Sequence, residues 1–437
     1  MNLSCLPRAS ALALLAFSFS SSAFASTPAS VDDALAQAKK THTPVLIDFG
    51  APWCYSCYFM ATHVLNGAEW HAVEVRTVVV ESDADSPDGA AWMKKLEIKA
   101  LPAYVVLNEN GEELGRILGE QARAKFYPAM NKILAGSHTL EELKKSAAAG
   151  STDAIATVLG SYEARRDGQA GLDWYASLPQ KTRAAAAKDK PIALWLDRLE
   201  LARAMKAKDN AGAVSAANRV LAGDIGCDRP YVVDQLLEAS EKLPAAERKP
   251  MLAAQKTALE ELLAKQVFVA KPVCADQRST VIATADIDAA LGDTAAETAV
   301  LDHAIASVRK QLGDDLKKDR NAADNLRVYL VRAKRNTELD ALYPKLIAAY
   351  PDDYVYPYRW GKSLLERGNA AAALPLLEQA AEKAYGENRL AVAIQRVKAL
   401  KALHREADAE KVVAEVLDQN GQWFPEQVAE LKKTLKS

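Results

Sequence analysis

Residues 44–57, PVLIDFGAPWCYSC, decide the fold of the first part of the chain. The apolar run Val45–Phe49 predicts a strand that is buried on both faces, as in a parallel sheet. A Gly-Ala-Pro break follows, and residues 58–65 are predicted to continue as a helix. Two cysteines separated by two residues, where a strand leads into a helix, are typical of a redox pair. The partial positive charge and free N–H groups of a helix N-terminus favour a thiolate at Cys54, and Cys57 lies one turn further on, within disulfide distance.

The composition is that of a folded protein with several hydrophobic cores. The chain has 437 residues, a formal net charge of −2 and 49% hydrophobic residues. This length is enough for two to three domains. A net charge this close to zero gives no reason to expect nucleic acid or an anionic membrane surface as a partner.

The first 25 residues have the pattern of a secretory signal peptide. Arg8 provides the positive charge, residues 9–19 form a short apolar region, and Ala-Phe-Ala at 23–25 fits a cleavage site. We therefore expect a mature chain that begins at Ser26 and is exported across the inner membrane to the periplasm. An uncleaved anchor is the alternative. No later stretch reaches the length of a spanning helix, so we expect no membrane span in the mature chain.

Loss of Cys5 with this segment would leave four cysteines, which allow three pairings. Proximity pairs Cys54 with Cys57, which leaves Cys227 to pair with Cys274. In an oxidising compartment the second bond is expected to be structural. The chain-entropy model gives a loop of this length about 3–5 kcal/mol of stabilisation.

Residues 31–134 alternate between helical and strand patterns over one domain's length. The expected order is α-β-α-β-α-β-β-α. The helices are expected at 31–40, 58–65, 90–96 and 122–134, and the strands at 45–49, 73–81, 103–107 and 112–118. The sequence Asn-Glu-Asn-Gly at 108–111 predicts a hairpin between the last two strands.

The motifs Asp48-Phe49, Ala51–Cys57, Leu101-Pro102 and Gly119 occur in the order and spacing of the thioredoxin superfamily. Residues 31–136 resemble the soluble C-terminal domain of DsbD-type thiol:disulfide interchange proteins and their secreted relatives. The resemblance covers about a quarter of the chain. It implies a thioredoxin-like α/β domain at residues 26–136.

The resemblance also implies roles for three catalytic residues. Cys54 would be the attacking thiolate, Cys57 would resolve the mixed disulfide, and Asp48 would exchange the proton of Cys57. A carboxylate within an apolar strand is desolvated, so its pKa is expected to rise into the range useful for proton transfer. The alternative for Asp48 is that it is an ordinary residue near a strand end, with no part in proton transfer. For the cysteines it is half a zinc site, which is disfavoured because no second Cys-x-x-Cys follows.

Four further residues are expected to contact substrate. By resemblance, the Leu101-Pro102 bond would be cis and would present backbone to a substrate peptide. Trp53 and Tyr55 flank Cys54 and are expected to line the edge of a peptide groove, with core packing as the alternative. The Tyr55-Ser56 dipeptide matches neither the Gly-Pro of reducing thioredoxins nor the Pro-His of strong oxidants. The direction of electron flow therefore stays open, and the family likeness favours reduction.

After Gly136 the strand signals end, and Ala, Leu, Glu, Lys and Arg dominate. Residues 137–320 are predicted to form helical hairpins. Residues 321–437 resemble tetratricopeptide (TPR) repeats, with a generic α-bundle as the alternative. Turn residues Asn336, Gly368 and His404 are each followed by small or β-branched residues expected where paired helices cross: Ala341, Ala348, Ala373, Ala380, Ala409 and Val416. The predicted helix breaks are at Gly160, 167–168, Pro179, Pro191, 223–226, Pro244, Pro272 and Gly292.

These observations favour an α/β thioredoxin-like domain followed by an all-α helical-hairpin solenoid. Such a solenoid has a concave face that is expected to bind a peptide or protein, or to serve as a structural arm. An aromatic cluster at Tyr354, Tyr356, Tyr358 and Trp360 is expected to be packing between repeats.

The predicted function is a periplasmic thiol:disulfide oxidoreductase that acts on protein thiols and disulfides. It would need no bound cofactor or metal, but it would need a redox partner that regenerates the pair. The alternative is a binding or assembly scaffold in which the Cys54–Cys57 bond is static.

Overall fold

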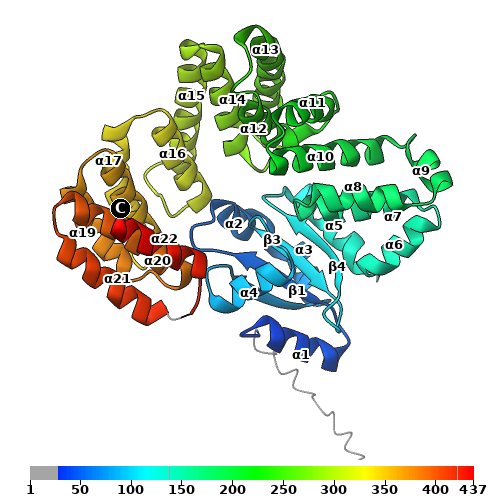
Figure 1. Cartoon of the computed structure of the whole chain (residues 1–437), viewed down its shortest axis with the longest axis horizontal. Helices are drawn as coiled ribbons and strands as arrows, with labels where there is room; N and C mark the ends of the chain where they lie inside the picture. Colours follow the sequence, from blue (N-terminus) through cyan, green and yellow to red (C-terminus); the bar gives the residue numbers. More distant parts are fainter. Residues whose placement is uncertain (1–27, 137, 421) are drawn as a thin grey trace, which may run out of the picture.

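The computed structural model describes residues 28–136, 138–420 and 422–437 (Figure 1). The predicted signal peptide lies outside the described residues. The structure has an α/β domain near the middle of the molecule and a long series of helices that curves around it. Within the described part of the chain, no helix is both long and apolar enough to cross a membrane.

The α/β domain has the element order that the sequence predicts, apart from one additional helix at residues 67–74. Its helices are α1 (Val31–Thr41), α2 (Tyr55–Phe59), the π-helical segment η1 (Met60–Val64), α3 (Gly67–Glu74), α4 (Pro87–Lys95) and α5 (Arg123–Ala135). Its strands are β1 (Val45–Gly50), β2 (Val78–Asp83), β3 (Ala103–Leu107) and β4 (Glu113–Leu118). They form one sheet in the order β2-β1-β3-β4. β1 pairs with β2 in parallel and with β3 in antiparallel orientation, and β3 and β4 form the hairpin.

Strand β1 is apolar on both faces because helices cover both sides of the sheet. Val45, Ile47 and Phe49 pack with residues of α1 and α4 on one side. Leu46 packs on the other side with residues of η1, α3 and α5. Since side chains alternate along a strand, Asp48 lies on the same face as Leu46, which is the face covered by the helix that follows the cysteines.

One predicted strand was placed wrongly. Residues 73–81 form a β-branched run, but Val73 lies in α3 and Val75 follows as its C-cap, so β2 begins only at Val78. β-Branched residues favour strands only weakly, and burial of Val73 in the core beneath the sheet overrides that preference. Likewise, α4 begins at Pro87, because Ser86 caps its first turn through a hydrogen bond from the Gly89 N–H.

The remainder of the chain is helical, and we call residues 140–436 the helical arc. Its first half contains α6 (Leu140–Ala148), α7 (Thr152–Ala164), α8 (Gly168–Ser177), α9 (Gln180–Ala186), α10 (Lys190–Ala207), α11 (Asn210–Leu221), η2 (Gly226–Asp228), α12 (Arg229–Ala239), α13 (Ala245–Leu262) and η3 (Leu263–Val267). Its second half contains α14 (Gln277–Leu291), α15 (Thr294–Leu312), α16 (Arg320–Arg332), α17 (Asn336–Ala349), α18 (Val355–Glu366), α19 (Ala370–Ala381), α20 (Gly386–Ala402), α21 (Glu406–Asn420) and α22 (Pro425–Lys436).

The arc begins beside β4, passes over the α/β domain and ends near α4 (Figure 1). Near its start, Arg165 of α7 forms ion pairs with Glu113 of β4 at 2.7 Å and with Glu97 at 3.3 Å. In its middle, α16 packs against α2. Near its end, the Glu387 N–H donates to the Asp85 carbonyl at 3.2 Å. The α/β domain therefore occupies the inner side of the arc.

The repeat pattern is reproduced only in part. Ala373, Ala380, Ala409 and Val416 are buried, as expected for helix crossings. Ala341 and Ala348 of α17 are exposed, so the first copy of the pattern does not mark a crossing. Gly160 does not break a helix. It lies inside α7, and a Cβ there would lie 3.3 Å from the Trp195 ring, so the glycine allows close packing of α7 against α10.

The aromatic cluster of α18 packs between helices. Tyr356 is fully buried, and Trp360 stacks on Tyr343 of α17 with ring centroids 5.7 Å apart. The Trp360 Nε1–H donates to Asp340 at 3.0 Å, which satisfies its polar atom.

The arc also contains a disulfide between Cys227 and Cys274, the pairing predicted from the sequence. It joins η2 to the loop before α14, and Cys274 is only 1% exposed. Asp276, two residues later, caps α14 by accepting the Ser279 N–H. The bond therefore fixes the chain at the start of α14.

Candidate functional site

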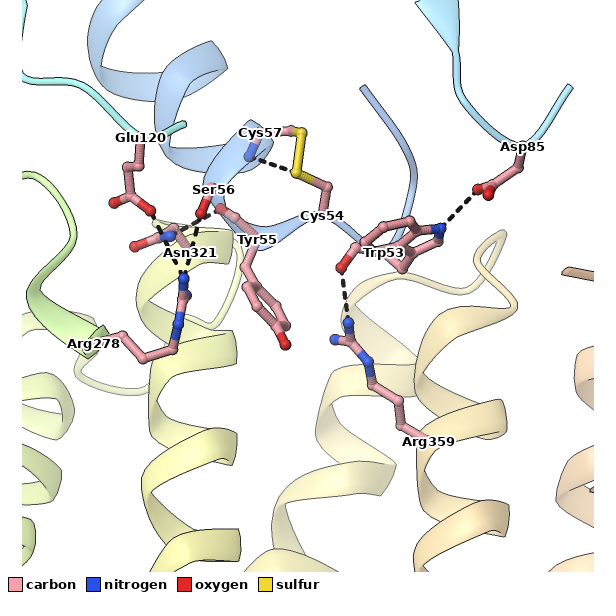
Figure 2. Close-up of a disulfide and its surroundings, with 10 residues drawn as sticks. All are labelled: Trp53, Cys54, Tyr55, Ser56, Cys57, Asp85, Glu120, Arg278, Asn321 and Arg359. Atoms are coloured by element: carbon pink, nitrogen blue, oxygen red, sulfur yellow. Dashed lines mark hydrogen bonds and ion pairs between the residues drawn. A yellow bond between two sulfur atoms is a disulfide. The ribbon is translucent and has the colours of Figure 1, made fainter. Parts of the chain in front are cut away.

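The Cys54–Cys57 disulfide lies at the N-terminus of α2, directly after strand β1 (Figure 2). Cys54 is the N-cap residue, and its Sγ accepts the backbone N–H of Cys57 at 3.1 Å. A sulfur in this position is favoured as an anion by the N–H groups and the dipole of the helix. Gly50 lies close by, because a Cβ at this position would be 3.8 Å from the Cys57 Sγ.

Asp48 lies two residues before Gly50 in β1, on the same face of the sheet. Burial, and secondarily the charge of Glu81, raise the pKa of Asp48 to about 7. At neutral pH such a group is present in both protonation states, which suits a proton donor and acceptor. The described geometry thus places a titratable carboxyl on the side of the sheet that faces Cys57.

The loop before β3 completes this end of the domain. The peptide bond between Leu101 and Pro102 is cis, as the resemblance implied, and Pro102 is buried. The Pro102 carbonyl accepts the Gly119 N–H at 2.8 Å. Gly119 has a φ of +75°, which glycine adopts without strain.

Trp53 precedes the disulfide and is 39% exposed. Its indole Nε1–H donates to Asp85 Oδ2 at 2.8 Å, so the ring is fixed to the loop after β2. Asp85 is only 3% exposed, and burial raises its pKa to about 6. The sequence indicated only a loop at Asp85, and no local pattern predicted this contact.

The segment Trp53–Cys57, which we call the CxxC segment, is contacted by the helical arc, where the sequence predicts the edge of a peptide groove. Three side chains of the arc contact it (Figure 2). Arg359 donates to the Trp53 carbonyl at 2.8 Å, Asn321 donates to the Tyr55 carbonyl at 2.9 Å, and Arg278 donates to Ser56 Oγ at 3.3 Å. Cys54 itself is only 4% exposed.

A comparison with protein families matches residues 31–134 to a model described as a thioredoxin-like domain. Residues 31–134 form a thioredoxin-like domain. The match covers a minority of the chain, and the helical arc lies outside it.

Curated relatives are similar to the same region. The chain is 29% identical over 107 residues to the thiol:disulfide interchange protein DsbD of Ralstonia nicotianae, which covers 24% of this chain and 18% of that protein. It is 35% identical over 107 residues to DsbD of Neisseria meningitidis, with the same coverage. It is 31% identical over 93 residues to thioredoxin H9 of Arabidopsis thaliana, covering 21% of this chain and 62% of that one. The chain thus spans less than a fifth of the length of these DsbD relatives.

Among solved structures, a DsbH oxidoreductase aligns at 21% identity and a TM-score of 0.22, covering 24% of this chain and 82% of that one. A thioredoxin from Thermus thermophilus aligns at 28% identity and a TM-score of 0.23, covering 24% and 83%.

A third carboxyl of the thioredoxin-like domain, besides Asp48 and Asp85, lies beside the CxxC segment. Glu120, directly after Gly119, is 9% exposed, and its Oε2 has no hydrogen-bond partner among the described residues. Burial and the nearby charge of Asp276 raise its pKa well above the usual range, while Arg278, 3.9 Å away, opposes the shift. Sequence reasoning did not single out Glu120, because its environment is created by the arc.

In residues 28–136, 138–420 and 422–437, no group of three or more His, Cys, Asp or Glu side chains is placed to hold a metal ion. The two cysteines bind each other, and His63 pairs instead with Asp319 of the arc at 2.9 Å.

Proposed function

We propose that the protein is a thiol:disulfide oxidoreductase of the bacterial envelope that exchanges dithiol for disulfide through Cys54 and Cys57. One observation carries this proposal: the Cys54 Sγ lies at a helix N-terminus, with a carboxyl of pKa about 7 on the side of the sheet that faces Cys57. The helix N-terminus stabilises the attacking thiolate. A carboxyl with a pKa near neutrality can take up and release the proton of the second cysteine.

In the reducing direction, the Cys54 thiolate attacks one sulfur of a substrate disulfide. A bond forms between the Cys54 Sγ and that sulfur, and the second substrate sulfur leaves as a thiolate, which takes a proton from solvent. Cys57 gives its proton to Asp48 and attacks the Cys54 Sγ. The first substrate sulfur then leaves, and the Cys54–Cys57 disulfide of this structure is formed.

Two electrons thus pass from the cysteine pair to the substrate. A thiol-containing partner would return them, and no bound cofactor is required. The similarity to DsbD and the apolar N-terminal segment support a periplasmic location. Backbone around Leu101-Pro102, together with Trp53, would contact the substrate chain, whereas the Tyr55 ring lies against Arg278 of the arc.

The low exposure of Cys54 favours one alternative, a binding or assembly scaffold with a static Cys54–Cys57 bond. The reduction potential of the pair separates the two functions. A working couple is expected between about −270 and −120 mV, whereas a structural bond lies below about −300 mV.

The direct test is reduction of insulin disulfides by residues 26–437 with dithiothreitol as the electron source. The proposal predicts precipitation of the insulin B chain faster than with dithiothreitol alone, and no acceleration by the Cys54→Ser variant. Full acceleration by Cys54→Ser would contradict it, as would absence of acceleration both by the wild type and by the variants of the arc contacts tested below.

A further inference from the structure

The contacts between the arc and the CxxC segment come from three separate helices. Arg278 lies in the first turn of α14, Asn321 lies in the first turn of α16, and Arg359 lies in α18. All three converge on residues 53–56 (Figure 2). Asn321 and Arg359 bind backbone oxygens, at 2.9 and 2.8 Å. These contacts can form together only because the middle of the arc, from α14 to α18, lies against the CxxC segment.

Tyr55, between the two cysteines, is enclosed by guanidinium groups. Its ring centroid lies 4.2 Å from the guanidinium carbon of Arg278, 5.0 Å from that of Arg359 and 5.9 Å from that of Arg327. A guanidinium over the face of an aromatic ring is attracted by the ring's electrons. The ring that was expected to contact a substrate is therefore already occupied.

The arginines are themselves held in place by buried partners. Asp324 is fully buried and accepts hydrogen bonds from Arg327 at 2.9 Å and from Arg359 at 2.7 Å. Arg278 is 9% exposed and donates to Asn325 at 2.9 Å. Buried charges are costly unless they are paired, so a paired set of this kind marks a built interface and not a passing contact.

A second contact holds the other side of the CxxC segment. Trp53 is bonded to Asp85, and the Asp85 carbonyl accepts the Glu387 N–H at the start of α20. Gly386 has a φ of +53°, and a Cβ at this position would lie 1.8 Å from the Asp85 carbonyl oxygen. Only glycine fits here without displacing the loop.

We propose that the helical arc is a gate that determines which disulfides Cys54 can attack, and that Arg278, Asn321 and Arg359 are its specificity-determining residues. In the closed arrangement the arc occupies the surface that a folded protein would need. A protein disulfide reaches Cys54 only when these contacts break. The substrate part of this inference rests on the proposed oxidoreductase function, whereas the shielding of Cys54 does not.

The test measures alkylation of Cys54 by a bulky reagent, a 5 kDa polyethylene glycol maleimide. It is made in full-length mature chains carrying Cys57→Ser, so that Cys54 is a free thiol, and the modified peptide is identified by mass spectrometry. Two independent variants open the gate. Asn321→Ala/Arg359→Ala removes two of the polar contacts, and Gly386→Ala forces the arc from the Asp85 loop while keeping them.

We expect both variants to raise the alkylation rate at least tenfold over the parent chain. The matched control is Arg219→Ala, which removes an arginine–aspartate pair within the arc, to Asp197, far along the chain from the gate contacts. It should leave the rate within about twofold. Circular dichroism establishes that each variant retains its helix content, and Gly386→Ala keeps the test decisive if the double variant does not fold.

An unchanged rate in a folded gate variant, or an equal increase in the Arg219→Ala control, would overturn the gate. The insulin assay is read separately, on the same substitutions with Cys57 intact. Faster alkylation without insulin reduction by any chain would remove the proposed function and leave the shielding. Insulin reduction together with an unchanged alkylation rate in the gate variants would support the proposed function and overturn the gate.

Discussion

The thioredoxin-like domain and the helical arc each contain one disulfide, and the two bonds differ in nearly every physical respect. Cys54–Cys57 spans three residues at a helix N-terminus, beside a carboxyl that titrates near neutrality. Cys227–Cys274 spans 47 residues and ties two distant segments of one helical core together. The first bond restricts little of the unfolded chain and is placed for chemistry, whereas the second restricts much of it and is placed for stability.

The largest expected difference is in trapping of substrates. Cys57→Ala leaves Cys54 without its resolving partner, so mixed disulfides should accumulate and insulin reduction should fall at least about a hundredfold. Cys274→Ala also leaves one unpaired cysteine, at Cys227, and serves as the matched control. It should trap nothing and keep its turnover. Non-reducing electrophoresis of periplasmic extracts checks this, and equal trapping by both variants would erase the distinction between the bonds.

The next difference is in stability. The chain-entropy expression gives about 4 kcal/mol for the long loop and about 2 kcal/mol for the short one. Cys227→Ala/Cys274→Ala should therefore lower the free energy of unfolding by about twice as much as Cys54→Ala/Cys57→Ala. Urea denaturation followed by far-ultraviolet circular dichroism measures both. A larger loss from the CxxC double variant would show that its bond is the structural one.

Replacing Asp48 should raise the stability of the protein and lower its activity. Its pKa is about 7 in the folded chain against 3.8 ordinarily, so between these pH values the folded state binds the extra proton and stability falls as pH rises. Asp48→Asn removes this cost. We expect it to stabilise the protein above pH 7 by on the order of 2–4 kcal/mol, with the gain vanishing as pH falls to about 4.

The same variant should reduce insulin about 10- to 100-fold more slowly at pH 7, because Cys57 loses its proton acceptor. Glu81→Gln, which removes the neighbouring charge only, is the control and should change turnover by less than about threefold. Full activity in Asp48→Asn would assign the carboxyl no part in the proton transfer.

The smallest expected effect concerns Trp53. Its indole donates to Asp85, whose pKa is about 6, so that carboxyl is ionised above pH 6 and neutral below it. The fluorescence of Trp53, obtained as the difference between wild type and Trp53→Phe, should change with a midpoint near pH 6. In Asp85→Asn the transition should be absent, and its persistence there would indicate another titrating group.

Local sequence patterns predicted the thioredoxin-like domain well. The apolar run in β1 and the hairpin at 108–111 are both properties of neighbouring residues. The same reasoning misplaced the start of β2, since Val73 and Val75 favour a strand locally while tertiary packing places Val73 in α3. It also took Gly160 for a helix break, although the glycine serves close packing against Trp195.

The covering of the CxxC segment could not be predicted in this way. Ser56 and Arg278 are separated by 222 residues, and Trp53 and Arg359 by 306. The residues next to Arg278 and Asn321 in the sequence do not mark them as contacts of a distant segment. The aromatic cluster around Arg359 indicated only packing between repeats. These three residues reach the CxxC segment because the whole arc curves over it. That curvature accumulates from many small helix–helix angles.

The hydrogen bonds from Asn321 and Arg359 end on main-chain oxygens of Tyr55 and Trp53. Every amino acid supplies such an oxygen, so these two attachments do not depend on which side chains stand at those positions. Exchanging the dipeptide between the cysteines would remove the side-chain contacts of Tyr55 and Ser56 with the arc, but these two backbone hydrogen bonds would remain. To this extent, the electron affinity of the cysteine pair and the steric access to it can change independently in a single polypeptide.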